Sequence, residues 1–329
     1  MPSLEPNRDG KYIIGIDIGG TFIKAAALDR HGHILATAKR DARAMDGVAA
    51  TMGQVVEAAR AVMADGGIDA AQVCGVGMGV PGRHRSDQGI CVYSPNFAGW
   101  SNVQVVAPVE EALGLATYMR NDVKTAALGE HRFGAGRGYR FVVMITLGTG
   151  IGGAAIIDGQ LRLGSSEGFA EVGHMCIDPD GPRCGCGNHG CWEAFAGRDG
   201  IIDRALRAVQ TGRTTALAQV AASSEGITPK AIADAANSRD VVAQEILEQI
   251  GFYVGVGIAN LVQLYDPEVV IIGGGIAAAG DWLFGAVRRT AQARARMVTF
   301  DPQRIVSAEL GDDAGVIGAS VLVLEHMGA

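Results

Sequence analysis

The amino-acid sequence predicts an α/β protein made of two similar lobes around a central cleft. The chain of 329 residues is long enough for two lobes with cores of their own. Residues 11–29 and 141–158 each contain an apolar strand, a glycine turn and a second apolar strand. The two segments match at a constant offset, which aligns Ile18 with Leu147. This repeat favours duplication of one unit, with a chance similarity of two glycine-rich hairpins as the alternative.

The composition indicates a soluble protein of the reducing cytoplasm. The formal net charge is −7 and no basic run stands out, which argues against nucleic acid or an anionic membrane as a partner. The N-terminus lacks the apolar segment of a signal peptide, and no apolar stretch reaches the ~18 residues that span a bilayer. Six cysteines fit a reducing compartment. We therefore expect a cytoplasmic location.

The first lobe is predicted at residues 1–120. Its first strand is rich in isoleucine and runs into a turn at Gly19-Gly20-Thr21. Its long helix has apolar residues at helical spacing and closes at Asp65-Gly66-Gly67. In order, the predicted elements are strands at 11–18 and 22–29, a helix at 47–64, a strand at 73–80, a helix at 108–113 and a short strand at 116–119.

The second lobe is predicted at residues 121–313, and the closing helix 314–329 is expected to pack back on the first lobe. The longest helix contains Gly251, Gly255 and Gly257, which should allow close packing, and it ends at Asp266-Pro267. In order, the predicted elements are strands at 141–147 and 151–158, helices within 199–221, 229–236 and 241–264, a buried strand at 268–272 and the closing helix.

Three cysteines and a histidine form a predicted metal site in the loop 174–191. Cys184, Cys186 and Cys191 lie on a glycine-rich knuckle whose backbone can turn sharply enough for three sulfurs to face one point. His174 is the fourth ligand, and a closed Cys3His set suits structural Zn2+ with no open position for a catalytic water. The alternative is a disulfide with a spare thiol.

Glycine turns at three strand ends are predicted to bind phosphate. The first two have exposed N–H groups and a hydroxyl, as phosphate-cradling turns require, and the third could admit the base and ribose of a nucleotide. The alternative for the first two is a pair of ordinary hairpins that need glycine for positive φ. The predicted residues are Gly19, Gly20, Thr21, Gly148, Thr149, Gly150, Gly274 and Gly275.

Two charged residues lie beside the first glycine turn. Asp17 ends the first strand, and an acid beside a phosphate would be repulsive unless Mg2+ bridges them, so we interpret Asp17 as a magnesium ligand, direct or through water. Lys24 could add positive charge that compensates a phosphate.

The pair Asn121-Asp122 follows the last strand of the first lobe. Phosphoryl transfer to a sugar hydroxyl needs a carboxylate that orients and deprotonates the attacking oxygen, and Asp122 is the candidate. The alternative is that Asp122 caps the following helix. Glu171, His174 and Glu193 could contact several hydroxyls of a polyol. Glu193 as a solvated surface acid and Glu171 as a partner of a zinc ligand are the other interpretations.

These motifs, in this order along nearly the whole chain, resemble the ROK family (repressor, open reading frame, kinase). They are Asp17-x-Gly-Gly-Thr-x-x-Lys24, Asn121-Asp122 with Leu128-Gly129-Glu130, Leu147-Gly-Thr-Gly-x-Gly-Gly153, Glu171-Val-Gly-His174 and Cys184-Gly-Cys186-Gly-x-x-Gly-Cys191-x-Glu193. The resemblance implies an actin-like, ribonuclease H-like fold with ATP and sugar in a cleft. It also implies roles for single residues: Asp122 as general base, Gly82, Asn96, Asn121, Glu171, His174 and Glu193 as sugar contacts, and His174, Cys184, Cys186 and Cys191 as zinc ligands.

Two positions depart from the family pattern. Ala170 stands where the family often has glycine, which adds a methyl group near the sugar loop. Lys124 stands where small or amide residues are common, and it could lower the pKa of Asp122 or point to solvent. The loop around Asn96 resembles that of the family's glucokinases.

The resemblance implies a hexokinase-type phosphotransferase that converts glucose to glucose 6-phosphate, a step of glycolysis, with ATP, Mg2+ and structural Zn2+. Alternatives in the family are an N-acetylglucosamine, N-acetylmannosamine or fructose kinase. A sugar-sensing regulator without a DNA-binding domain is the non-enzyme alternative: repressors of the family carry an N-terminal helix-turn-helix, whereas only ten residues precede the first predicted strand here. We expect sugar and ATP as partners, no nucleic acid, no membrane, and a homodimer or higher homo-oligomer.

Overall fold

The computed structural model describes residues 4–224 and 226–328. Contacts within the chain divide it into two compact units. Unit 1 comprises Met1–Gly138, Leu161–Phe169 and Glu309–Ala329, and unit 2 comprises Tyr139–Gln160 and Ala170–Ala308. The contacts place the first division at Gly138, whereas the sequence suggests one after residue 120. The lobe boundaries suggested by the sequence stay a prediction.

Unit 1 contains a five-stranded sheet in the order β3-β2-β1-β4-β8. The strand β1 pairs antiparallel with β2 and parallel with β4, and β4 continues parallel to β8. The carboxyl ends of β1, β4 and β8 therefore meet at one edge, and Asp17 and Asn121 lie at this edge. The strands are β1 (Tyr12–Ile18), β2 (Phe22–Asp29), β3 (Ile34–Asp41), β4 (Val73–Val80) and β8 (Thr117–Asn121).

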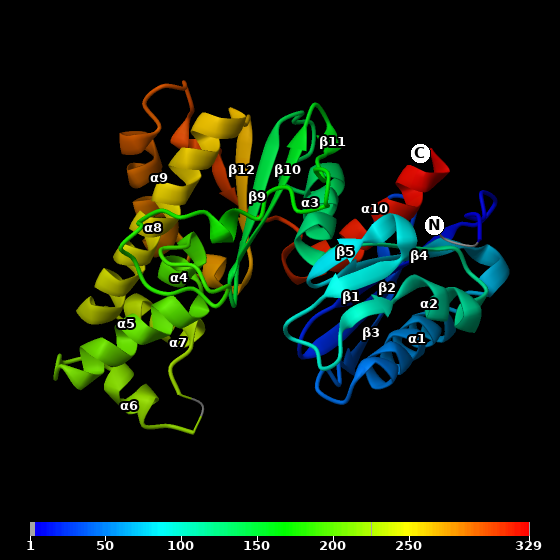
Figure 1. The fold of residues 1–329 in the computed structure, drawn as a ribbon, viewed down its shortest axis with the longest axis horizontal. Helices are drawn as coiled ribbons and strands as arrows, with labels where there is room; N and C mark the ends of the chain where they lie inside the picture. Colours follow the sequence, from blue (N-terminus) through cyan, green and yellow to red (C-terminus); the bar gives the residue numbers. More distant parts are fainter. Residues whose placement is uncertain (1–3, 225, 329) are drawn as a thin grey trace. The chain divides into compact units, whose positions relative to one another are not determined.

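Helices cover both faces of the unit 1 sheet, because alternate residues of its strands point to opposite faces (Figure 1). Ile14 and Ile16 share a core with α1, whereas Ile13 shares a core with α10. Glycine lets α10 approach the sheet: a Cβ on Gly15 would lie 2.0 Å from the Val316 oxygen. The helices are α1 (Val48–Asp65), α2 (Val106–Leu113), α3 (Asp122–Phe133) and α10 (Ala314–Met327), with short 3-10 turns η1 (Ala70–Gln72) and η6 (Gly311–Asp313).

Unit 2 repeats the same sheet topology, in the order β11-β10-β9-β12-β13. The antiparallel hairpin of β9 and β10 corresponds to that of β1 and β2, and β12 pairs parallel with both β9 and β13. Both hairpins close through three residues, 19–21 and 148–150. This correspondence supports the duplication seen in the sequence. The strands are β9 (Val142–Leu147), β10 (Ile151–Ile157), β11 (Gln160–Leu161), β12 (Val269–Gly273) and β13 (Ile305–Ser307).

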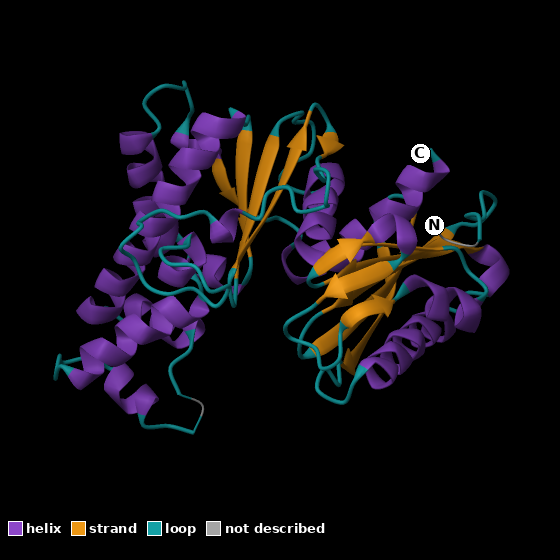
Figure 2. Cartoon of the chain, viewed as in Figure 1, coloured by secondary structure: helices purple, strands orange, loops and turns teal. Residues whose placement is uncertain are grey.

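Unit 2 carries most of the helices (Figure 2), and Figure 1 shows α8 and α9 on the same side of its sheet. They are α4 (Trp192–Ala196), α5 (Arg198–Gln210), α6 (Leu217–Ala221), α7 (Pro229–Asn237), α8 (Val241–Tyr265) and α9 (Asp281–Arg294), with 3-10 turns η3 (Val172–His174), η4 (Gly275–Ala279) and η5 (Pro302–Arg304).

The helix α8 is long and apolar enough to cross a membrane by length and composition alone, so the expectation that no stretch reaches that length is wrong. Its buried aliphatic side chains explain the apolar character, since 56% of the apolar window lies inside the structure, and its glycines are contact points of this core helix. A Cβ on Gly251 would lie 2.5 Å from that of Ala286 in α9, and one on Gly257 would lie 2.1 Å from the Trp192 ring. The predicted close packing at these glycines is confirmed.

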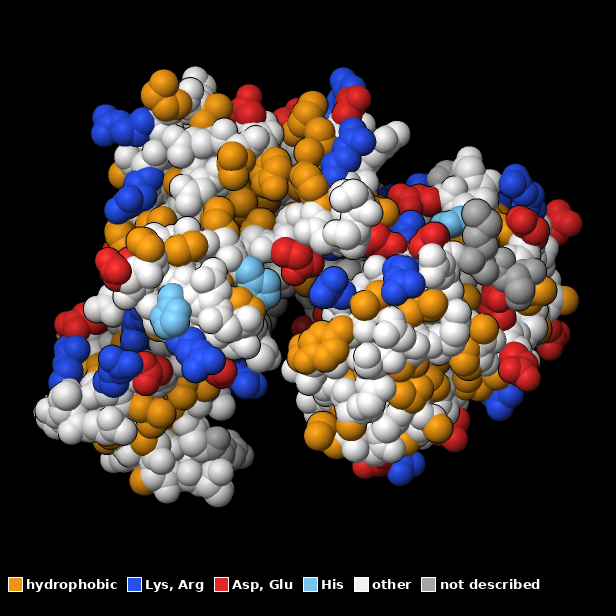
Figure 3. Space-filling view, viewed as in Figure 1, with side chains coloured by type: hydrophobic (Ala, Val, Ile, Leu, Met, Phe, Trp, Pro, Cys, Tyr) orange, Lys and Arg blue, Asp and Glu red, His pale blue; other side chains and the backbone are white. Residues whose placement is uncertain are grey.

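Several elements were not expected from the sequence. The strand β3, the helix α9 and a small antiparallel sheet of β5 (Arg83–Arg85), β6 (Ile90–Tyr93) and β7 (Ser101–Gln104), with the 3-10 turn η2 (Ser86–Gln88), are additions to the predicted order. The strands of the small sheet have only three or four residues, and β5 and β7 are mostly polar, so they give little periodic signal. On the face shown in Figure 3, acidic and basic side chains are interspersed on both units.

Candidate active site and metal centre

The predicted site residues fall into one group in each unit. Unit 1 holds Asp17, Gly19, Gly20, Thr21, Lys24, Gly82, Asn96, Asn121 and Asp122. Unit 2 holds Gly148, Thr149, Gly150, Glu171, His174, Cys184, Cys186, Cys191, Glu193, Gly274 and Gly275.

Two carboxylates lie close together at the edge of the unit 1 sheet. A Cβ on Gly79 would lie 3.3 Å from the Asp17 Oδ1 and 3.5 Å from the Asp122 Cα. Burial and, to a smaller extent, the charge of Asp122 raise the pKa of Asp17 to about 7, and Lys24 opposes the shift. Gly315 of α10 closes over Asp17, because a Cβ there would lie 2.5 Å from the carboxyl carbon. A divalent cation near these carboxylates would relieve their repulsion, so the pair suits Mg2+.

The helix cap of α3 is Asn121, so the interpretation of Asp122 as the cap is wrong. The Asn121 Oδ1 accepts hydrogen bonds from the Val123 N–H at 3.1 Å and the Lys124 N–H at 3.2 Å. Asp122 is the first residue of the helix, where the helix dipole favours a negative charge. Its carboxylate is therefore not needed for capping.

Gly82 lies against Asn121 and cannot be replaced by a larger residue without strain. The Asn121 Nδ2 donates to the Gly82 oxygen at 3.3 Å. Gly82 has φ of 105°, and a Cβ there would lie 2.2 Å from the Tyr93 oxygen. The exposed Asn96 belongs to the following loop, in which the Ala98 N–H donates to the Ala44 oxygen at 2.8 Å.

Lys24 has a partner that the sequence did not indicate. Its Nζ lies 2.5 Å from the Asp313 Oδ1 and 3.1 Å from the Asp312 oxygen, both in the turn before α10. The side chain is 30% exposed. If Lys24 compensates the charge of a phosphate, its ammonium group must interact with both the phosphate and the Asp313 carboxylate.

The first glycine turn does not need glycine for its backbone conformation. Neither Gly19 nor Gly20 has a left-handed φ, and the same is true of Gly148 and Gly150. The interpretation of the two turns as hairpins that need glycine for positive φ is therefore wrong. A Cβ on Gly20 or Gly148 would meet no atom within 4 Å, so a ligand can approach the backbone of both turns closely. The Gly148 N–H already donates to the Gly150 oxygen at 3.0 Å.

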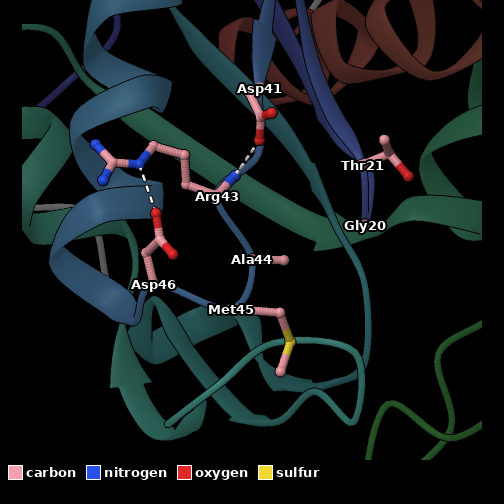
Figure 4. A pocket seen from close by; sticks show the side chains of 7 residues that line it. All are labelled: Gly20, Thr21, Asp41, Arg43, Ala44, Met45 and Asp46. Carbon is pink, nitrogen blue, oxygen red and sulfur yellow. Dashed lines mark hydrogen bonds and ion pairs between the residues drawn. The ribbon is translucent and has the colours of Figure 1, made fainter.

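An open hollow of about 510 Å³ borders the first glycine turn (Figure 4). Its lining residues are Gly20, Thr21, Asp41, Arg43, Ala44, Met45 and Asp46. Arg43 is held within it: its Nε donates to Asp46 at 2.8 Å and its backbone N–H donates to the Asp41 Oδ1 at 2.8 Å. The Arg43 guanidinium is therefore already paired with Asp46, and a ligand in the hollow would mainly meet the backbone of the glycine turn.

The glycine turn of unit 2 lies against Glu193. A Cβ on Gly150 would lie 2.3 Å from the Glu193 Oε2, so glycine makes room for this carboxylate. Gly274, with φ of 86°, lies against the same strand end, since a Cβ there would be 2.4 Å from the Leu147 oxygen. Gly275 faces open space. The two glycine turns and Glu193 thus belong to one region of unit 2.

The four predicted metal ligands lie together. The nearest ligand atoms of His174, Cys184, Cys186 and Cys191 are all within 4.8 Å of one another. The Cys186 and Cys191 sulfurs are 3.7 Å apart, close to the ~3.8 Å expected for two thiolates on a tetrahedral zinc. All six cysteines of the chain are free, so the disulfide alternative is wrong. The donor set fits a closed structural zinc site.

Glu193 and His174 connect the metal centre to the polar residues around it. The Cys184 thiol donates to the Glu193 Oε1 at 3.0 Å, and the His174 Nδ1 lies 3.5 Å from the same oxygen. Because Nδ1 faces the cluster, the Nε2 of His174 stays available for a hydroxyl. Glu171 is exposed and immediately precedes η3. Glu193 is therefore a neighbour of the predicted metal ligands and not a solvated surface acid.

Comparison with known proteins gives one consistent result. A sequence profile of the ROK family matches residues 13–326. The glucokinase of Thermotoga maritima is 33% identical over all of both chains. The crystal structure of a ROK family glucokinase from Streptomyces griseus with glucose and AMPPNP superimposes with a TM-score of 0.82 and 34% identity, covering 95% of this chain and 99% of that one. The xylose repressor of Bacillus subtilis is 26% identical over 97% of this chain and 79% of the repressor.

Proposed function

This chain belongs to the ROK family, and from that membership we infer that it is an ATP-dependent hexokinase-type kinase that phosphorylates glucose. The observation that carries the inference is the full-length similarity to glucokinases, at 33–34% identity, together with the sheet topology and the Asp17–Asp122 pair. Similarity to a xylose repressor is lower, at 26%. The actin-like fold of ROK sugar kinases follows from the same neighbours.

Asp122 is proposed as the general base. Its carboxylate takes the proton of the attacking sugar hydroxyl as the oxygen bonds to the γ-phosphorus of ATP and the bond to ADP breaks. It lies at the N-terminus of α3, where the helix dipole favours a negative charge, and the helix is capped by Asn121. Mg2+ bound near Asp17 would neutralise charge on the phosphates.

The residues of unit 2 are proposed to hold the substrates. The open space beside the backbone of Gly148 and Gly275 suits the close approach of phosphate groups. Glu171, the Nε2 of His174 and Glu193 suit sugar hydroxyls. His174, Cys184, Cys186 and Cys191 would hold a zinc ion that fixes the loop from which His174 projects, a structural contribution.

Glucose is proposed over N-acetylated hexosamines. An acetamido group at C2 needs space and new hydrogen-bond partners, and Phe169 and Ala170 add bulk beside Glu171. Ala170 holds a left-handed φ of 63° and is 9% exposed, so its methyl group is packed within the chain. A site built on hydroxyl contacts discriminates strongly against analogues that leave those groups unpaired.

The test is the ratio of kcat/KM for glucose, mannose, fructose, N-acetylglucosamine and N-acetylmannosamine with ATP and Mg2+. Glucose should give the highest value, and mannose, which differs at C2 alone, a lower one. Preference for an N-acetylated sugar would contradict the substrate and keep the kinase assignment. Inorganic polyphosphate in place of ATP tests the donor.

A cytoplasmic location and a homo-oligomer are part of the same proposal. Light scattering after size exclusion should give at least twice the chain mass of 34.0 kDa. A monomer at micromolar concentration would contradict the oligomer.

A further inference from the structure

A buried polar network in unit 1 surrounds the residues proposed to contact the sugar. It joins the start of α3, the strand β5 and the segment Leu161–Phe169, which belongs to unit 1 although both flanking segments belong to unit 2. Its centre is Glu167. Neither the proposed mechanism nor the motifs that resemble the ROK family include this residue.

The Glu167 carboxylate binds Ser86 with both oxygens. Its Oε1 accepts from the Ser86 N–H at 2.7 Å, and its Oε2 accepts from the Ser86 hydroxyl at 2.6 Å. Arg120 of β8 lies 3.9 Å from Oε2. The Glu167 side chain is 19% exposed, so these charge-assisted bonds are shielded from solvent.

Lys124 attaches the same residue to α3. Its side chain is 2% exposed, and its Nζ donates to the backbone carbonyl oxygen of Glu167 at 2.7 Å. The expectation that Lys124 could point to solvent is therefore wrong. One turn earlier on the same helix, Asn121 caps the helix and donates to the Gly82 oxygen. Gly82 leads directly into β5 and Ser86, which closes a ring of contacts back to Glu167.

The backbone conformation at position 167 indicates that the glutamate side chain has a role at this position. Glu167 has a left-handed φ of 57°, a conformation that costs ~1 kcal/mol for a residue with a Cβ and nothing for glycine. Glycine would form this turn at a lower conformational free energy, so the glutamate side chain must contribute something that offsets the strain. Strained residues that persist point to function.

The charges of the network also depend on Glu167. Burial, with Lys124 and Arg120 nearby, lowers the pKa of His84 to about 4, so this histidine is neutral at pH 7. The charged groups near one another include Lys124, Arg120 and Glu167, and Glu325 lies near Arg120 as well. Without the Glu167 carboxylate, Ser86 at the end of β5 would lose both of its bonds to this residue.

We propose that Glu167 is a positioning residue for sugar binding. Its carboxylate holds Ser86, which keeps β5 and the adjoining Gly82 in place, and Gly82 in turn accepts the hydrogen bond of Asn121. This proposal rests on the proposed sugar kinase activity. Glu167 acts on the sugar through these neighbours, and ATP binding does not depend on it.

The variant Glu167→Gly distinguishes two roles of this residue: positioning of the sugar contacts by its carboxylate, and formation of the turn by its backbone. Glycine removes the carboxylate and relieves the backbone strain at the same time. Positioning predicts a glucose KM at least about tenfold higher, with the ATP KM within about twofold of wild type. A turn role predicts an unchanged glucose KM, and this result would overturn the proposal. Arg239→Gly is the matched control, since Arg239 is exposed, has φ of 68° and should leave both KM values unchanged.

A double-mutant cycle checks the pathway. Ser86→Ala should raise the glucose KM by itself and have no further effect in the Glu167→Gly background. Additive effects of the two substitutions would contradict the contact as the route. Glu167→Gln, which keeps the size and loses the charge, should fall between wild type and Glu167→Gly.

Hydrogen exchange tests the network without any sugar. In Glu167→Gly, the Ser86 amide loses its acceptor, and the Val123 and Lys124 amides at the Asn121 cap should exchange faster than in wild type. Unchanged exchange at all three amides would overturn the proposal. A wild type that fails to phosphorylate glucose while exchange changes as expected would overturn the proposed function and leave the network in place.

Discussion

Replacing Asp17 by asparagine should stabilise the ligand-free protein at neutral pH and not at low pH. Burial raises the pKa of Asp17 from 3.8 to about 7, and Asp122 adds to the shift. Between these two values the folded state binds more protons than the unfolded state, so the free energy of unfolding falls as pH rises. Above pH ~7 the charged carboxylate is a full penalty on the folded state.

The size of this effect follows from the shift. About three pKa units correspond to ~4 kcal/mol at most, and partial solvent exposure of the side chain reduces the expected gain in Asp17→Asn to ~2 kcal/mol. Asparagine keeps the shape and cannot ionise. The gain should be complete above pH ~7 and absent below pH ~4.

Urea unfolding of wild type and Asp17→Asn, without ATP or Mg2+, from pH 4.5 to pH 8 measures this difference. The Asp122→Asn background provides the internal control, because removal of that charge should reduce the gain from Asp17→Asn. A gain of the same size at both ends of the pH range would refute the reasoning.

Three further substitutions test the rest of the site. Cys186→Ser should lower bound zinc from about one per chain to a small fraction, with a lower Tm and weaker glucose binding; full activity of metal-free wild type would contradict a structural metal. Asp122→Asn should reduce kcat on the order of 10²–10⁴-fold while glucose still binds, and a rate within a few-fold of wild type would exclude it as the base. Gly150→Ala should displace the flexible Glu193 carboxylate, which lies 2.3 Å from the new Cβ, raising the glucose KM at nearly constant Tm; an unchanged KM would remove Glu193 from the sugar site.

The parts of the fold that the sequence predicted are those with local signals. The two hairpins have apolar strands on either side of a glycine turn, and they repeat at a fixed offset in the sequence. The matching strand orders of the two sheets agree with this equivalence. The Cys3His cluster was also readable, because three of its ligands lie within eight residues, Cys184–Cys191. Short polar strands such as β5 gave no comparable signal.

The site details that the sequence missed depend on partners far along the chain. Lys24 is paired with the Asp313 carboxylate, and Lys124 donates to the backbone carbonyl of Glu167, at separations of 289 and 43 residues. Neither pair has a spacing rule, so only the fold brings them together. The cap of α3 is a local feature that the sequence leaves ambiguous. Asn and Asp are both good N-cap residues and are adjacent here, so residue type alone could not assign the role to Asn121.

The most direct test of the central claim is product formation by the purified wild-type protein with ATP, Mg2+ and glucose. We expect glucose 6-phosphate and ADP in equal amounts, with release of ADP much slower when glucose is left out, because water is a poor substitute for the bound hydroxyl. ADP release at the same rate with and without glucose, or no phosphorylated sugar at all, would contradict the account.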